Sequence, residues 1–166
     1  MIPAPFTYRR AWSVDEALEL AGQGGDDAKF LAGGHSLLPL MKLRFAVPGV
    51  LIDIGRLGEL SFLRDEDGHI VVGALTSHHD LATSGLLARE LPLLAHAAGR
   101  VGDPQIRHRG TIGGSLAHGD PAGDQAGVLL AKTRPAELGR LRGLGLRGHD
   151  VAPASAARCT ARTMFS

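Results

Sequence analysis

Two glycine-rich segments carry the residue types that bind phosphate in proteins. One is Ala32–Ser36, with the sequence AGGHS, and the other is Thr111–Ser115, with the sequence TIGGS. Adjacent glycines permit positive φ and carry no Cβ, so successive backbone N–H groups can converge on one oxyanion. The Ser and Thr hydroxyls add further donors. One such loop can hold one phosphate, and two that face each other could clamp a diphosphate.

An alternative is that each Gly-Gly pair simply marks a tight turn. Neither segment matches the G-x-G-x-x-G dinucleotide fingerprint or the G-x-x-x-x-G-K-[ST] phosphate loop, so the standard nucleotide-binding folds are disfavoured. The residue types alone leave both interpretations open.

The histidines give a weaker indication of chemistry. His78-His79-Asp80, or His118 with Asp120 and His35, could suggest a metal site. Neighbouring histidines on a helix point in different directions, however, and no Cys or Glu-x-x-His motif accompanies them. We therefore predict no metal site, and expect residues 78–80 to be solvated at the start of a helix.

Two further sets of polar residues are of types that take part in catalysis or binding. Ser36 and Ser115 have no evident Ser–His–Asp partners, so no catalytic residue is predicted. Residues 107–109, with the sequence RHR, could face a bound phosphate or another protein, or could form an exposed basic loop.

Composition limits the classes of protein that remain. The chain has 166 residues, of which 44% are hydrophobic, enough for one domain with a core. Its single cysteine, Cys159, rules out a disulfide scaffold and a Cys-rich zinc or iron–sulfur site. No apolar run is long enough for a membrane helix, and the start does not resemble a secretory signal. We expect a soluble, cytoplasmic protein.

The charge is unevenly distributed. Residues 1–124 carry 11 basic and 15 acidic side chains, whereas residues 125–166 carry 7 and 2. A basic tail can bind nucleic acid, but this one lacks clustered Lys/Arg runs and interleaved aromatic residues. We therefore predict no nucleic-acid partner.

The elements that must position the two loops are short. Ser13-Val-Asp-Glu16 is a capping box and predicts a helix that ends at Gly24-Gly25. Strands are predicted at 6–8 and 50–54, a hairpin at 60–73, and helices at 37–43, 77–81 and 91–101. Residues 29–32 form a short apolar run that leads into the first glycine loop. Residues 102–110 read as a polar loop. Short strands mixed with helices, without regular alternation, favour an α+β fold.

Longer motifs around the two loops resemble a known family. Residues 32–42 (AGGHSLLPLMK) and 111–124 (TIGGSLAHGDPAGD) resemble the two flavin-binding signatures of the FAD-binding medium subunit of molybdenum hydroxylases, of the carbon monoxide and xanthine dehydrogenase type. The segments 5–8, 13–17, 53–54, 70–74 and 105–111 are similar in the same order. The resemblance covers about residues 3–124.

The resemblance implies a two-lobed FAD-binding domain of the vanillyl-alcohol-oxidase-like (PCMH) type, with the second lobe incomplete. Lobe 1 would span residues 1–57, lobe 2 residues 58–131, and a divergent basic tail, expected to be poorly ordered, residues 132–166. The implied cofactor-binding residues are Ala32, Gly33, Gly34, His35, Ser36, Thr111, Ile112, Gly113, Gly114, Ser115 and Asp124.

The family also implies a role and partners. The substrate would be oxidised in a large molybdopterin-binding subunit, and electrons would pass through a small [2Fe–2S] subunit to FAD and then to an external acceptor. Alternatives are a stand-alone flavin oxidoreductase of the same fold and a non-catalytic module that binds a phosphorylated ligand or a partner protein. The substrate and the acceptor stay open.

The resemblance ends near residues 124–131, where the composition becomes rich in Ala, Arg, Gly and Leu. Such a composition is typical of a GC-rich gene read out of frame. We therefore expect a truncated form whose tail is a frameshift product or a remnant, and sequencing of codons 120–135 would test this hypothesis.

Overall fold

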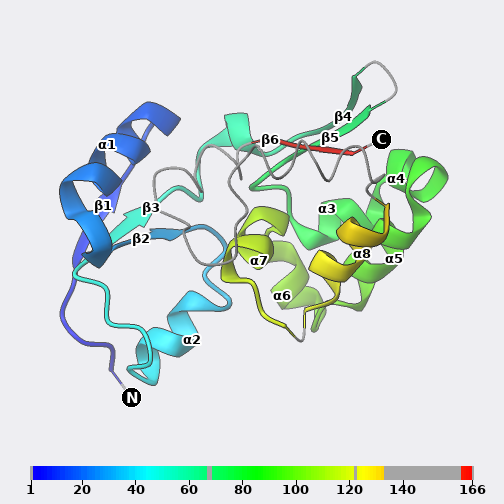
Figure 1. Cartoon of the computed structure of the whole chain (residues 1–166). Helices are drawn as coiled ribbons and strands as arrows, with labels where there is room; N and C mark the ends of the chain where they lie inside the picture. The colour runs from blue at the N-terminus through cyan, green and yellow to red at the C-terminus, as the bar shows by residue number, and fades with distance from the viewer. Residues whose placement is uncertain (1, 67–68, 122, 133–161, 166) are drawn as a thin grey trace.

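Two separate sheets organise the chain (Figure 1). The computed structural model describes residues 2–66, 69–121, 123–132 and 162–165. The first sheet is parallel and lies near the N-terminus, whereas the second is antiparallel and is accompanied by most of the helices. This is the expected α+β, two-lobed architecture. We keep the division after residue 57 as a proposal, and call residues 2–57 the first lobe and the later ones the second lobe.

The first lobe is built on a three-stranded parallel sheet. Its elements are β1 (Thr7–Arg10), α1 (Val14–Gly24), η1 (Gly25–Asp27), β2 (Ala28–Leu31), α2 (Leu37–Lys42) and β3 (Val50–Asp53). The strand order is β1-β3-β2, so β3 is central, and both Arg10 and Leu31 pair with Asp53. All three carboxyl ends therefore meet at one edge, which is where open α/β sheets bind ligands.

The second lobe combines a hairpin with a group of short helices. Its elements are η2 (Gly58–Leu60), β4 (Leu63–Glu66), β5 (His69–Gly73), α3 (His78–Thr83), α4 (Gly85–Glu90), α5 (Pro92–Arg100), α6 (Pro104–Arg109), α7 (Ile112–His118), α8 (Asp124–Lys132) and β6 (Arg162–Phe165). The central strand β5 pairs antiparallel with β4 and with β6. Helix α5 packs against α3, α4 and α8.

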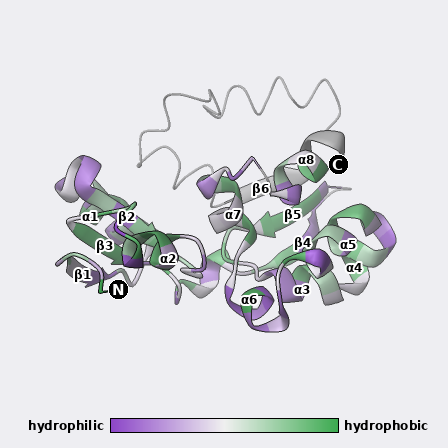
Figure 2. Cartoon of the chain, turned by 90° about the horizontal axis from the view of Figure 1, so that it is seen from below, coloured by the Kyte–Doolittle hydropathy of each residue, from purple (hydrophilic) through white to green (hydrophobic). Residues whose placement is uncertain are grey.

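Two hydrophobic clusters fill the interior. The larger cluster joins β5 to α3, α4, α5 and α7, and includes Val72, Leu81, Leu94 and Ile112. The other lies between α1 and the parallel sheet, and also includes Leu57 and Leu75. In Figure 2 the apolar residues accordingly gather on the strands and on the inner faces of the helices. Since Leu75 packs with the first lobe, the two lobes share apolar contacts near the proposed boundary.

The prediction of a polar loop at 102–110 is wrong. Pro104–Arg109 forms α6, because the Asp103 side chain accepts a hydrogen bond from the Ile106 amide (2.9 Å) and Pro104 stands at the first helical position. Helix α4, capped by Ser84, was not predicted either.

The expectations for the tail at 132–166 lie largely outside the described residues. Within it, Lys132 ends α8, and Arg162–Phe165 form β6 beside β5.

Candidate functional site

The first glycine loop connects β2 to α2 at the carboxyl edge of the parallel sheet. Gly34 has φ +78°, a conformation that favours glycine, and it lets the chain turn from the strand into the helix. His35 and Ser36 are exposed, while Ala32, Gly33 and Gly34 are half-buried. The Gly34 carbonyl accepts a hydrogen bond from the Leu38 amide (3.0 Å).

The amides of this loop are free to bind a ligand. Among the described residues, the backbone N–H groups of residues 33–37 have no acceptor, and the Ser36 side chain makes no capping bond. Five successive free donors around a positive-φ glycine are the arrangement expected for an anion site. The loop thus retains the donors that the sequence analysis attributed to it.

The second glycine loop has a different structure. It forms the start of α7, with Thr111 as the cap whose Oγ1 accepts from the Gly114 amide (3.2 Å). The Ile112 amide donates to the Thr76 carbonyl (3.1 Å) and the Gly113 amide to the Ala74 carbonyl (2.9 Å). These three amides are therefore already engaged, contrary to the expectation that they would converge on an oxyanion.

Instead of free amides, the second loop has residues that are packed closely against the second lobe. Ile112 is fully buried in the core of the second lobe. A Cβ at Gly113 would lie 2.6 Å from Ala74 Cβ, so glycine is needed for packing there. Gly114 and Ser115 are half-buried, and the Ser115 hydroxyl donates to Gln125 Oε1.

The two loops meet across the lobes. A Cβ built on Gly33 would lie 2.1 Å from the Arg109 carbonyl oxygen and 3.0 Å from Gly110 Cα. A Cβ built on Gly114 would lie 3.9 Å from Ala32 Cβ. In Figure 1 the segment between β2 and α2 correspondingly lies beside α6 and α7. Both glycine loops therefore line one junction.

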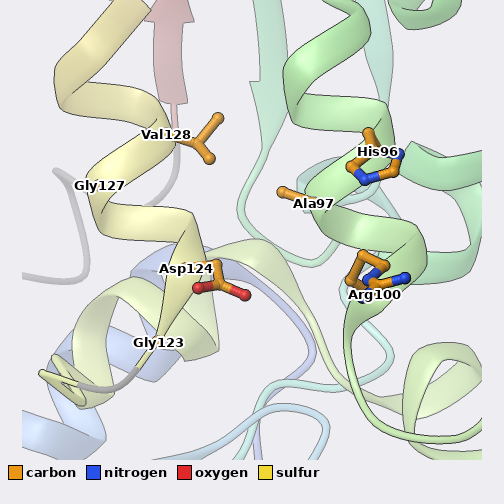
Figure 3. Close-up of a pocket in the computed structure, with 7 residues that line it drawn as sticks. All are labelled: His96, Ala97, Arg100, Gly123, Asp124, Gly127 and Val128. Atoms are coloured by element: carbon orange, nitrogen blue, oxygen red, sulfur yellow. The ribbon is translucent and has the colours of Figure 1, made fainter.

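Asp124 lines a pocket that includes no residue of the two glycine loops. It begins α8, is exposed, and lines an open pocket of about 480 Å³ with His96 and Arg100 of α5 (Figure 3). Its side chain points toward the α5 side in Figure 3. Its assignment to the cofactor site stays a prediction.

The next residue, Gln125, contacts the second loop and was missed by sequence reasoning. Its Oε1 accepts a hydrogen bond from the Ser115 hydroxyl (3.3 Å), and its buried Nε2 has no partner among the described residues. Gln125 is only 5% exposed. The available signal was its place on the apolar stripe of Val128 and Leu129, where a polar residue is unusual.

The histidines take up two environments. His78 is buried beneath Gly110, and this burial lowers its pKa, so the expectation that it is solvated is wrong. It is drawn inward because α3 packs on α5 and α6. His79 stacks on His108, with ring centroids 3.9 Å apart. Among the residues that the structure describes, no group of three or more His, Cys, Asp or Glu could hold a metal ion.

The basic residues of α6 serve mainly the local structure. The Arg107 guanidinium donates to the carbonyls of Val101 and Gly102 (3.1 Å each), which ties α6 to the end of α5. Arg109 has an exposed side chain, but its carbonyl faces Gly33. None of the described helices is both long and apolar enough to span a bilayer.

Comparisons with known proteins agree with one another. A family model for the FAD binding domain in molybdopterin dehydrogenase matches residues 4–137. The chain is 54% identical over 131 residues to the carbon monoxide dehydrogenase medium chain of Hydrogenophaga pseudoflava, covering 79% of this chain and 46% of that one. It is 50% identical over 131 residues to the 6-hydroxypseudooxynicotine dehydrogenase complex subunit alpha of Paenarthrobacter nicotinovorans, with 79% and 44% covered.

Solved structures give the same result. Carbon monoxide dehydrogenase from Hydrogenophaga pseudoflava, in a form that lacks the Mo-pyranopterin moiety of the molybdenum cofactor, superposes with a TM-score of 0.78 and 54% identity, covering 80% of this chain and 46% of that one. Quinoline 2-oxidoreductase from Pseudomonas putida 86 gives a TM-score of 0.76 at 33% identity, over 80% and 46% of the two chains. The chain spans about half the length of the relatives it matches.

Proposed function

Because the chain belongs to the family of FAD-binding domains of molybdopterin dehydrogenases, we propose that it holds FAD at the junction of its two glycine loops and serves as an electron-transfer subunit. The family membership confirms the resemblance in the sequence, and it makes FAD the cofactor. Which residues contact FAD, and what the assembled protein does, belong to the proposal.

The first loop fits the diphosphate of FAD. The free amides of residues 33–37 can donate to phosphate oxygens, and Gly33 and Gly34 let the backbone approach them closely. In this proposal Ala32 supports the loop, and the exposed His35 and Ser36 contribute their amides and the Ser36 hydroxyl.

The second loop contributes differently. Since its first amides are engaged, Thr111, Ile112 and Gly113 would hold the loop in shape, while Gly114 leaves room for the cofactor. The Ser115 hydroxyl, which donates to Gln125 Oε1 in the free chain, would turn its O–H to the cofactor. Gln125 can add its unpartnered amide beside Ser115. Asp124 stays a candidate. To contact it, the cofactor would have to reach the pocket that Asp124 lines together with residues of α5.

The proposed partner subunits rest on the names of the similar proteins. They are named medium chains and complex subunits, and one similar structure is a carbon monoxide dehydrogenase in a form that lacks the Mo-pyranopterin moiety of the molybdenum cofactor. We extend the proposal to a large molybdopterin-binding subunit and a small [2Fe–2S] subunit, and to a cytoplasmic location. The bound flavin would supply the redox chemistry between the [2Fe–2S] clusters and an external acceptor, while this chain binds and orients it. The single cysteine, Cys159, leaves the clusters to another subunit.

The observation that carries the proposal is the meeting of Gly33 with Arg109 and Gly110 beside five free amides. Titration of the purified chain with FAD, followed by flavin fluorescence, should show saturable binding. FMN, which lacks the diphosphate bridge, should bind at least about tenfold more weakly. Equal affinity for FAD and FMN would contradict the diphosphate site, and no binding of either would contradict the proposed function.

A further inference from the structure

The carboxyl end of β3 lies directly behind the first glycine loop. Asp53 ends β3 opposite Leu31, the last residue of β2 before the loop. The Ile54 amide donates to the Leu31 carbonyl (3.0 Å). A Cβ built on Gly55 would lie 3.3 Å from the Ala32 carbonyl oxygen. The turn at residues 53–55 therefore packs against the residues at which the first glycine loop begins.

The Asp53 carboxylate fixes this turn from two sides. Its Oδ1 accepts a hydrogen bond from the Gly55 amide (2.8 Å), which is an Asx turn. Its Oδ2 accepts a hydrogen bond from the Tyr8 hydroxyl of β1 (2.5 Å). The Asp53 carbonyl also accepts from the Ala11 amide (3.0 Å). One residue thus connects β1, β3 and the turn that supports the loop.

Direct contact between Asp53 and phosphate is disfavoured. A carboxylate repels a diphosphate, and both carboxylate oxygens already accept hydrogen bonds from the protein. The bond to Asp53 raises the pKa of Tyr8, so the phenol stays protonated and remains a donor at neutral pH. Asp53 is therefore placed to hold the turn behind the first glycine loop, and not to bind the phosphate itself.

We propose that Asp53, held by Tyr8, is the positioning residue that keeps the first loop in the conformation that binds the FAD diphosphate. The inference rests on the proposed function, and it adds two residues that carry no glycine-loop motif. Neither residue is expected to touch the cofactor.

The test compares FAD affinity in the purified chain and its variants. Asp53→Ala removes the acceptor for the Gly55 amide and should raise the Kd for FAD about tenfold. Asp53→Asn keeps an oxygen acceptor for that amide and should restore the Kd to within about threefold. Tyr8→Phe should give an intermediate loss. Asp15→Ala, which removes an exposed carboxylate from α1, is the matched control and should leave the Kd within about twofold.

A second readout needs no cofactor. Hydrogen exchange of the Ile54 amide in the FAD-free chain should be faster in Asp53→Ala than in Asp53→Asn, because only the alanine variant loses the Asx turn. Unchanged exchange in Asp53→Ala, or an asparagine variant as weak in FAD binding as the alanine variant, would overturn the positioning role. If Asp53→Ala does not fold, an unchanged FAD affinity in Tyr8→Phe overturns it. Failure of the unsubstituted chain to bind FAD would instead overturn the proposed function.

Discussion

At Gly33 the space that a side chain would need is filled by backbone from the second lobe. A Cβ there would lie 2.1 Å from the Arg109 carbonyl oxygen, and a main-chain atom cannot rotate away as a side chain can. Gly33 is therefore where the structure of one loop depends most directly on the other.

Gly33→Ala should weaken FAD binding by at least about tenfold, because the added methyl group separates the loop from residues 109–110. Fluorescence titration of the purified variant measures the effect. Gly22→Ala in α1 is the control, since nothing lies within 4 Å of a Cβ at Gly22. Equal FAD affinity in the Gly33 variant and the unsubstituted chain would remove Gly33 from the site.

Among the elements, α7 shows how a glycine-rich segment becomes a helix. Thr111 caps it with its hydroxyl, and the carbonyls of Ala74 and Thr76 accept its first amides. The helix is short and contains Gly113 and Gly114, so this cap is a large part of what defines its start.

Thr111→Ala should lower the free energy of unfolding by about 1 kcal/mol, because the Gly114 amide loses its acceptor. Thr111→Ser retains the hydroxyl and should recover most of the loss. Urea denaturation measures both. Thr83→Ala, at the exposed end of α3, serves as the control, and should change the stability by less than about 0.5 kcal/mol. Equal losses in the Ala and Ser variants of Thr111 would show that the hydroxyl does not act as a cap.

The elements that were predicted correctly have local signals. The Glu16 amide donates to Ser13 Oγ (3.1 Å) as the capping box required, and the β4–β5 hairpin lies where two segments flanking a turn sequence placed it. Helices α4 and α6 have six residues each, as do α2 and α3, and so few residues give no hydrophobic period. They were missed because their capping residues, Ser84 and Asp103, were not taken as helix starts.

The candidate site was predictable in part. Sequence located both glycine loops, because glycine pairs followed by hydroxyl residues are recognisable in one dimension. The sequence could not show that the carbonyls of Ala74 and Thr76 accept hydrogen bonds from the amides of the second loop. Those bonds depend on the path of the chain after β5, which runs beside the start of α7. The contact between Gln125 and Ser115 likewise depends on the packing of α7 against α8.

For the whole molecule, His78 links stability to pH. Burial lowers its pKa below the ordinary value in the folded chain, and its Nδ1 has no partner among the described residues. The unfolded chain therefore binds the proton more readily. The contribution of neutral His78 to the free energy of unfolding is therefore complete above a pH of about 6.5, and it is lost as the pH falls below that value.

Urea midpoints measured between pH 7.5 and 5 should accordingly fall more steeply for the unsubstituted chain than for His78→Gln. His96→Gln, which changes an exposed histidine on α5, is the matched control and should follow the unsubstituted chain. Parallel pH profiles for all three proteins would refute the role of His78.

The parallel sheet also constrains the order in which the chain can fold during synthesis. Among the described residues, strands β1 and β2 each pair only with β3, and β3 is the last of the three to be made. Until Val50–Asp53 has left the ribosome, Thr7–Arg10 and Ala28–Leu31 have no partner strand in the sheet. A nascent chain arrested before residue 50 should therefore remain sensitive to protease throughout its N-terminal segment.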